Sequence, residues 1–232
     1  MNTQTLRQAR AQRGWTQLEA ARRLGVSQPY LAMLEAGKRP LTARVARRAL
    51  RVYGLPPTVL PPAPLAEGVE RFDNQTVAEE LARFRYPGFA YLRGHRRARN
   101  PAEVLLASLR NDDLEPRLTE GLTWLLLRFG ADLDTRWLVK QARLLNVQNR
   151  LGFLTNLARR VAESSARFHQ QAEQLRRLER ELESSRLAVE ETLCEASLPE
   201  AKRRWLAQNR PPEAAHWNLL TNWRPEHCRY VV

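Results

Sequence analysis

The sequence predicts an all-α protein, and three observations lead to this fold class. Serine, threonine, aspartate or asparagine repeatedly precedes a run whose apolar residues recur at the spacing of an amphipathic helix. No long stretch alternates apolar and polar residues as a half-buried strand does. Prolines gather near residue 60, where proline-rich backbone favours a semi-rigid spacer between two folded parts.

These patterns divide the chain into four predicted segments. They are a five-helix N-terminal domain (1–60), a Pro-rich linker (61–69), a helical middle domain (70–150) and a last region with one long helix and a docked helical tail (151–232). In the first domain we expect helices over 3–13, 16–24, 27–35 and 42–53, followed by a short fifth helical turn that ends at Leu60.

The central feature of the first domain is a pair of short helices within residues 14–39 that meet at a glycine turn. Thr16 and Glu19 have the spacing of a capping box, and Ser27 can cap the second helix. Gly25 tolerates the positive φ that the turn between them needs. The second helix combines a polar start with a basic exit, which suits insertion into a DNA major groove.

Positive charge is concentrated in the same part of the chain. Residues 1–64 hold 11 basic and 2 acidic side chains, a net charge of +9, whereas the whole chain carries +13. One basic stripe, at helical spacing, lies on the fourth helix and consists of Arg44, Arg47, Arg48 and Arg51. It is either a solvated face or a surface in which Arg44 reaches a phosphate while the others steer DNA or meet an acidic partner.

Three short motifs identify a resemblance. They are WTQ at 15–17, the run from Ala21 to Ser27 with the pattern A-x-x-L-G-V-S, and LEAGKRP from Leu34 to Pro40. With these motifs, residues 5 to about 60 resemble the helix-turn-helix domain of phage lambda repressor-like and Cro-type regulators, the XRE family. The resemblance implies binding to double-stranded DNA through a recognition helix.

The resemblance and the outward positions of the second helix suggest roles for individual residues. Base contacts are expected from Gln28, Pro29, Tyr30 and Met33, and phosphate contacts from Gln17, Ser27, Lys38, Arg39 and Arg44. Arg10 and Glu35 match a structural pair that ties the first helix to the end of the recognition helix. Pro29 departs from the family, whose members often carry a second polar base-reader there, and its ring favours apolar contact with a thymine methyl group.

Beyond the linker, the strongest pattern predicts one long helix from Gln148 to about Glu195. An apolar column with a seven-residue repeat runs through Leu154, Val161, Phe168, Leu175, Leu182 and Val189. The companion column is only partly apolar, so the helix either forms a coiled-coil dimer seam or packs along the middle domain. We favour the seam, because regulators of this class bind two-fold operators as dimers.

Other functional classes find little support in the residues. Two cysteines and four scattered histidines predict neither a disulfide framework nor a metal site, and no cofactor or catalytic motif is present, so we expect no enzyme. The family sometimes carries a β-rich self-cleaving protease domain, which this helical pattern argues against. Without a signal-like or membrane-spanning stretch, the expected setting is the cytoplasm.

Three functional hypotheses remain. The leading one is a transcriptional regulator, in the simplest case a repressor, that binds operator DNA as a homodimer. The second is an antitoxin that neutralises a partner toxin through its helical C-terminal region and represses its own operon. The third is a ligand-sensing regulator in which the aromatic segment from Tyr86 to Tyr91 lines a pocket, although the same aromatics could be ordinary core residues.

Overall fold

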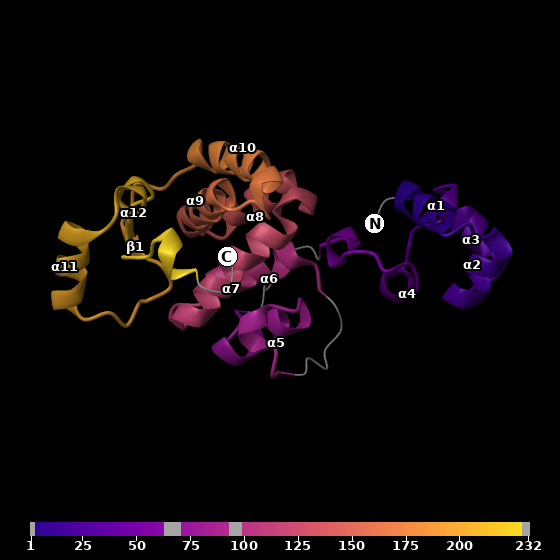
Figure 1. The fold of residues 1–232 in the computed structure, drawn as a ribbon, viewed down its shortest axis with the longest axis horizontal. Helices are drawn as coiled ribbons and strands as arrows, with labels where there is room; N and C mark the ends of the chain where they lie inside the picture. Colours follow the sequence, from indigo (N-terminus) through magenta and orange to yellow (C-terminus); the bar gives the residue numbers. More distant parts are fainter. Residues whose placement is uncertain (1–2, 63–70, 93–98, 229–232) are drawn as a thin grey trace. The chain divides into compact units, whose positions relative to one another are not determined.

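The structure, a computed structural model, describes residues 3–62, 71–92 and 99–228, which form two compact units (Figure 1). The first unit contains residues 3–62 together with 99–100, and the second contains the other described residues. Most of the predicted linker at 61–69 lies outside the described residues. The described residues are mostly helical, which agrees with the all-α prediction.

The first unit is a small bundle of four α-helices and one 3-10 turn. Its elements are α1 (Thr3–Gln12), α2 (Gln17–Leu24), α3 (Gln28–Glu35), α4 (Ala43–Tyr53) and η1 (Pro57–Val59). The predicted fifth helix is therefore a single 3-10 turn. The core is formed by aliphatic residues from all four helices, among them Leu6, Leu24, Leu31 and Ala49.

The local signals for α2 and α3 act as predicted. The Thr16 hydroxyl accepts a hydrogen bond from the backbone N–H of Glu19, and the Glu19 carboxylate accepts one from that of Thr16, which completes the capping box. Gly25 ends α2 with φ +64°, and the Ser27 hydroxyl accepts from the N–H of Tyr30 at the start of α3. These caps set the angle at which α3 leaves α2.

The second unit is larger and is organised around α9. Its α-helices are α5 (Asn74–Arg83), α6 (Pro101–Leu109), α7 (Pro116–Phe129), α8 (Thr135–Leu144), α9 (Gln148–Ser164), α10 (Ala172–Glu183), α11 (Glu200–Asn209) and α12 (Pro212–His216). Short 3-10 turns lie at Pro87–Phe89, Gly130–Asp132, His169–Gln171 and Pro225–His227. Helix α9 packs against both α7 and α10, so all of its residues from Leu151 to Ala158 are buried (Figure 1).

The chain after α10 folds back onto this helical core. Strand β1 (Glu191–Thr192) pairs in parallel with β2 (Leu219–Leu220), a two-residue contact that leaves the fold class unchanged. The Trp217 ring is fully buried and lies directly on Gly152 of α9, where even a Cβ atom would come within 2.3 Å of the ring. The tail is therefore packed into the core by its aromatic residue.

The prediction of one long helix over 148–195 is wrong. Helix α9 ends at Ser164, Ser165 adopts an extended conformation, and α10 begins at Ala172 after a 3-10 turn. The Ser164 hydroxyl donates a hydrogen bond back to the carbonyl of Val161, so the side chain competes for the last turn of the helix. The two helices form a hairpin instead of a rod, and residues 184–190 belong to no helix.

The prediction of a coiled-coil dimer seam is wrong for the same reason. Five residues of the predicted column are buried in the core of the second unit: Leu154, Val161, Phe168, Leu175 and Leu182. The sixth, Val189, is 71% exposed and lies outside the helices. The alternative interpretation, packing within the chain, is the one that the structure supports.

Within the described ranges, every helix is too short or too polar to cross a lipid bilayer.

Candidate nucleic-acid interface

Helix α3 presents one side to the core of the first unit and the other to solvent. Leu31 and Leu34 are fully buried, which fixes the rotation of the helix about its axis. Of the predicted base contacts, Pro29 is exposed and Gln28 and Met33 are half-buried. Tyr30 is also half-buried, but it packs against the apolar core, which leaves less of its ring for an external contact.

A chain of hydrogen bonds connects Gln28 to the interior of the domain. Gln28 Nε2 donates to Gln17 Oε1 over 3.0 Å, and Gln17 Nε2 donates to Glu35 Oε2 over 3.0 Å. Glu35 also accepts from Arg10, from Nε at 2.7 Å and from Nη2 at 3.1 Å. Only one Nε2 hydrogen of Gln28 is used, so its second hydrogen and its Oε1 atom can together contact the edge of an adenine.

The Arg10–Glu35 pair anchors this chain in a poorly solvated place. The two side chains are 17% and 4% exposed. Burial by itself raises the pKa of Glu35, but hydrogen bonds from Arg10 and Gln17 outweigh this effect and hold the pKa below its ordinary value. Arg10 donates in addition to the carbonyl of Trp15, so one guanidinium joins α1, the start of α2 and the end of α3.

The predicted phosphate contacts differ in how free their side chains are. Ser27, Lys38, Arg39 and Arg44 are exposed, around the two ends of α3 and at the start of α4. Gln17 is half-buried, and its amide bonds to both Glu35 and Gln28. Lys38 and Arg39 therefore follow the end of α3 and Arg44 lies in the first turn of α4, while the Gln17 amide holds the Gln28 side chain.

Three arginines of the first unit make contacts that the sequence did not indicate. Arg48 lies over Gly25, where a Cβ atom would come within 2.6 Å of its Nη1, and its Nε donates to the carbonyl of Arg23. Arg23 stacks on the Trp15 ring with 4.3 Å between its Cζ and the ring centroid. Arg13 donates to the carbonyl of Tyr53 over 2.8 Å. These contacts join different helices and loops of the first unit. The spacing of residues in the sequence does not predict them.

The other candidate features lie in the second unit. Tyr86 and Phe89 are buried core residues whose rings meet edge-on at 5.6 Å, whereas Tyr91 is exposed, so this segment fits the core-packing interpretation better than a ligand pocket. Cys194 and Cys228 are buried free thiols, and burial raises the pKa of each to about 12. Among the residues that the structure describes, no three of His, Cys, Asp and Glu are grouped as a metal site requires.

Comparison with known proteins identifies the first unit. Residues 6–60 match the family described as Helix-turn-helix, in agreement with the XRE resemblance of the same segment. This part of the chain is therefore a DNA-binding domain of the kind that transcription regulators carry. Neither a curated protein nor a solved structure matches the chain.

Proposed function

We propose that this protein is a sequence-specific transcriptional regulator, a repressor, that binds operator DNA as a homodimer with α3 in the major groove. The observation that carries the proposal is the hydrogen-bond chain from Arg10 through Glu35 and Gln17 to Gln28. A side chain that reads a base must be held in one orientation before binding, because ordering it at the interface costs affinity. This hydrogen-bond chain holds the Gln28 side chain in one orientation at the start of α3.

Base recognition is assigned to the start of α3. We assign to Gln28, the first residue of α3, a bidentate contact with adenine N6 and N7, a pairing that discriminates by about 1–3 kcal/mol. Pro29 is exposed beside it and has no backbone donor, so its ring suits a thymine methyl group. Met33 follows one turn later and can extend the apolar contact.

Backbone recognition is assigned to Ser27, Lys38, Arg39 and Arg44. All four are exposed, and they belong to a segment that carries a net charge of +9 over residues 1–64. Contacts of this kind fix the register of the protein on DNA without reading its sequence. They also make binding sensitive to salt, because each neutralised phosphate releases counterions.

Dimeric binding follows from the geometry of two-fold operators, whose half-sites lie about 34 Å apart along one face of the duplex. The apolar column over 154–182 is buried within the second unit, so the proposed dimer uses other surfaces. Light scattering of the protein with and without a two-fold duplex measures this part of the proposal. A single copy on an operator with two half-sites would contradict it.

The test of the assignment is selection from a random duplex library by the wild type, Gln28→Ala and Lys38→Gln. We expect Gln28→Ala to lose about tenfold of its preference at one base position in each half-site. We expect Lys38→Gln to bind all sequences more weakly and to lower the salt slope by about one. A Gln28→Ala protein with full operator preference, or a wild type with no preference, would contradict the proposal.

A second candidate is an antitoxin whose helical C-terminal region neutralises a toxin. It is favoured by the size of the second unit, whose packed core extends from Phe72 to Cys228 and exceeds what dimerisation requires. Co-expression with the product of the neighbouring gene tests it. A stable complex that relieves growth inhibition supports the antitoxin, and the absence of any interaction leaves the repressor alone.

A further inference from the structure

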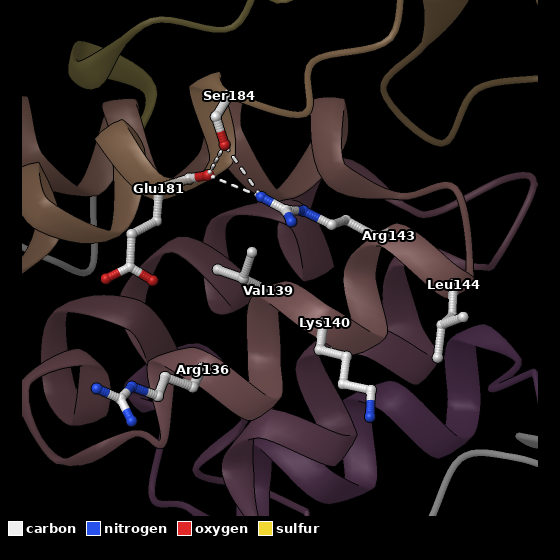
Figure 2. Close-up of a pocket in the computed structure, with 7 residues that line it drawn as sticks. All are labelled: Arg136, Val139, Lys140, Arg143, Leu144, Glu181 and Ser184. Atoms are coloured by element: carbon white, nitrogen blue, oxygen red, sulfur yellow. Dashed lines mark hydrogen bonds between the residues drawn. The ribbon is translucent and has the colours of Figure 1, made fainter.

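The second unit has a surface hollow of about 520 Å³ between α8 and the end of α10 (Figure 2). Helix α8 contributes Arg136, Lys140 and Arg143, and the far side is formed by Glu181 and Ser184 of the α10 end. No motif in the sequence marks this place. Its volume is within the range of ligand-binding sites, and it is largely open to solvent, so we call it the groove.

One cation of the groove has an internal structural role. Arg143 Nη2 donates to Ser184 Oγ over 3.0 Å and to the carbonyl of Glu181 over 3.4 Å (Figure 2). The Ser184 hydroxyl donates to the same carbonyl. These bonds satisfy the last turn of α10, where unpaired carbonyls and the helix dipole favour a positive charge. Arg143 thus fixes the two walls of the groove relative to each other.

The other two cations have no such role. Arg136 and Lys140 lie one helical turn apart on the exposed face of α8, and Figure 2 shows both extending away from the Arg143 contacts. Neither forms an ion pair with any residue in the described ranges, and α8 contains no acidic residue. On the neighbouring α10, by contrast, Arg176 and Arg177 both pair with Glu173.

The groove also has an apolar component. Leu144, at the end of α8, is 65% exposed, which is a large fraction for an aliphatic side chain, and the buried Val139 also lines the groove. Glu181 provides a carboxylate on the opposite wall, so the three cations leave a net positive charge. A ligand complementary to this surface carries two negative charges and a neighbouring apolar side chain.

From this complementarity we propose that the groove between α8 and α10 binds an acidic segment of a partner protein. Two carboxylates pair with Arg136 and Lys140, and an aliphatic or aromatic side chain covers Leu144. A DNA backbone fits less well, since it offers no apolar group for Leu144. The inference does not depend on operator binding by α3. It specifies the groups that a protein partner of a regulator or antitoxin would present, namely two carboxylates and an apolar side chain.

The test uses the full-length chain and a peptide probe of glutamate, leucine and alanine, about fifteen residues long so that it can form a helix. Two glutamates are placed one turn apart beside a leucine, the ends are blocked, and an uncharged fluorophore reports binding by anisotropy. We expect Arg136→Gln/Lys140→Gln to weaken binding about tenfold, the combined effect of two exposed ion pairs. Leu144→Ser is expected to weaken it about fivefold.

The matched control is Lys202→Gln/Arg204→Gln, which removes the same charge from exposed positions on α11. This variant is expected to bind the peptide like the wild type, and all variants are expected to keep wild-type affinity for a random-sequence duplex. A wild-type circular dichroism spectrum and urea midpoint show that the variants are folded, and unchanged duplex affinity shows that the groove is not a DNA surface.

Each other outcome overturns the proposal. If the wild type does not bind the peptide, or if both double variants lose affinity equally, the groove has no specific role. A peptide with serine in place of leucine that binds equally well would leave only general charge attraction. A loss of duplex affinity confined to Arg136→Gln/Lys140→Gln would assign the surface to nucleic acid. Failure of operator preference at Gln28 would leave this result unaffected.

Discussion

Gln28 donates its side-chain amide hydrogen to Gln17 Oε1, 3.0 Å away, so the proposed base-reading side chain is held by a residue of the preceding helix. Because the two amides are coupled, Gln17→Ala should reduce base preference at the position read by Gln28. A double-mutant cycle of Gln17→Ala and Gln28→Ala on the selected duplex should give a coupling energy of about 1 kcal/mol. The exposed Gln8→Ala on α1 is the matched control, and strictly additive effects of Gln17 and Gln28 would contradict the coupling.

The buried ion pair of the first unit should dominate its stability. Replacing Glu35 by Gln leaves the Arg10 guanidinium without its counter-charge in a site where Arg10 is only 17% exposed. We expect a loss of about 3 kcal/mol in the free energy of opening of this domain. Hydrogen exchange of backbone amides over residues 5–53, read by mass spectrometry, measures it without interference from the second unit.

Glu19→Gln is the control for this experiment, because Glu19 is an exposed carboxylate of the same domain in the α2 capping box. A glutamine can still accept the Thr16 N–H, so we expect a much smaller loss of protection than in Glu35→Gln. Equal protection losses in the two variants would show that the Arg10–Glu35 pair contributes no more to the free energy of opening than an exposed carboxylate does.

The same carboxylate should make the first unit sensitive to acid. The pKa of Glu35 in the folded domain lies below its ordinary value of 4.5, so the unfolded state binds the proton more readily. The stabilisation is complete above pH 4.5 and is lost as the pH falls through the lower folded-state pKa. Urea or exchange measurements from pH 6 to about pH 3 should show a slope that is shallower in Glu35→Gln. Identical slopes would remove Glu35 as the source.

Close packing of Trp217 on Gly152 should tie the C-terminal tail to α9. A Cβ at residue 152 would lie 2.3 Å from the indole ring, so Gly152→Ala is expected to cost about 3 kcal/mol. Trp217→Leu alone opens a cavity and also destabilises the protein. In the Gly152→Ala/Trp217→Leu protein the smaller side chain makes room for the methyl group, so urea unfolding should give a loss smaller than the sum of the single losses.

How far the sequence predicts the structure depends on whether the signal is local. Thr16, Glu19, Gly25 and Ser27 each act on atoms within a few residues, and α2 and α3 begin and end where these residues place them. The pairing of Arg10 with Glu35 spans 25 positions and was available only through the family resemblance. Arg48 over Gly25 has no local signal, because its helical spacing indicates only membership of a basic stripe.

The long-helix prediction failed because a seven-residue repeat does not specify its partner. Leu154 and Val161 on α9 and Leu175 and Leu182 on α10 all face the same core, so the repeat continues across a turn that contains neither proline nor glycine. The local indication is the polar pair Ser164–Ser165, in which the Ser164 hydroxyl donates to the helical carbonyl of Val161. Whether apolar columns meet within one chain or between two depends on distant residues such as Trp217 and Phe129.

Because the repeat folds back on itself, it limits which other proteins this chain can associate with in a cell. A helix whose leucine and valine residues are buried in its own core presents no apolar seam to the coiled-coil helix of another protein. Two regulators built in this way would not trade subunits through α9 and α10, and their genes could duplicate without producing mixed assemblies along these helices.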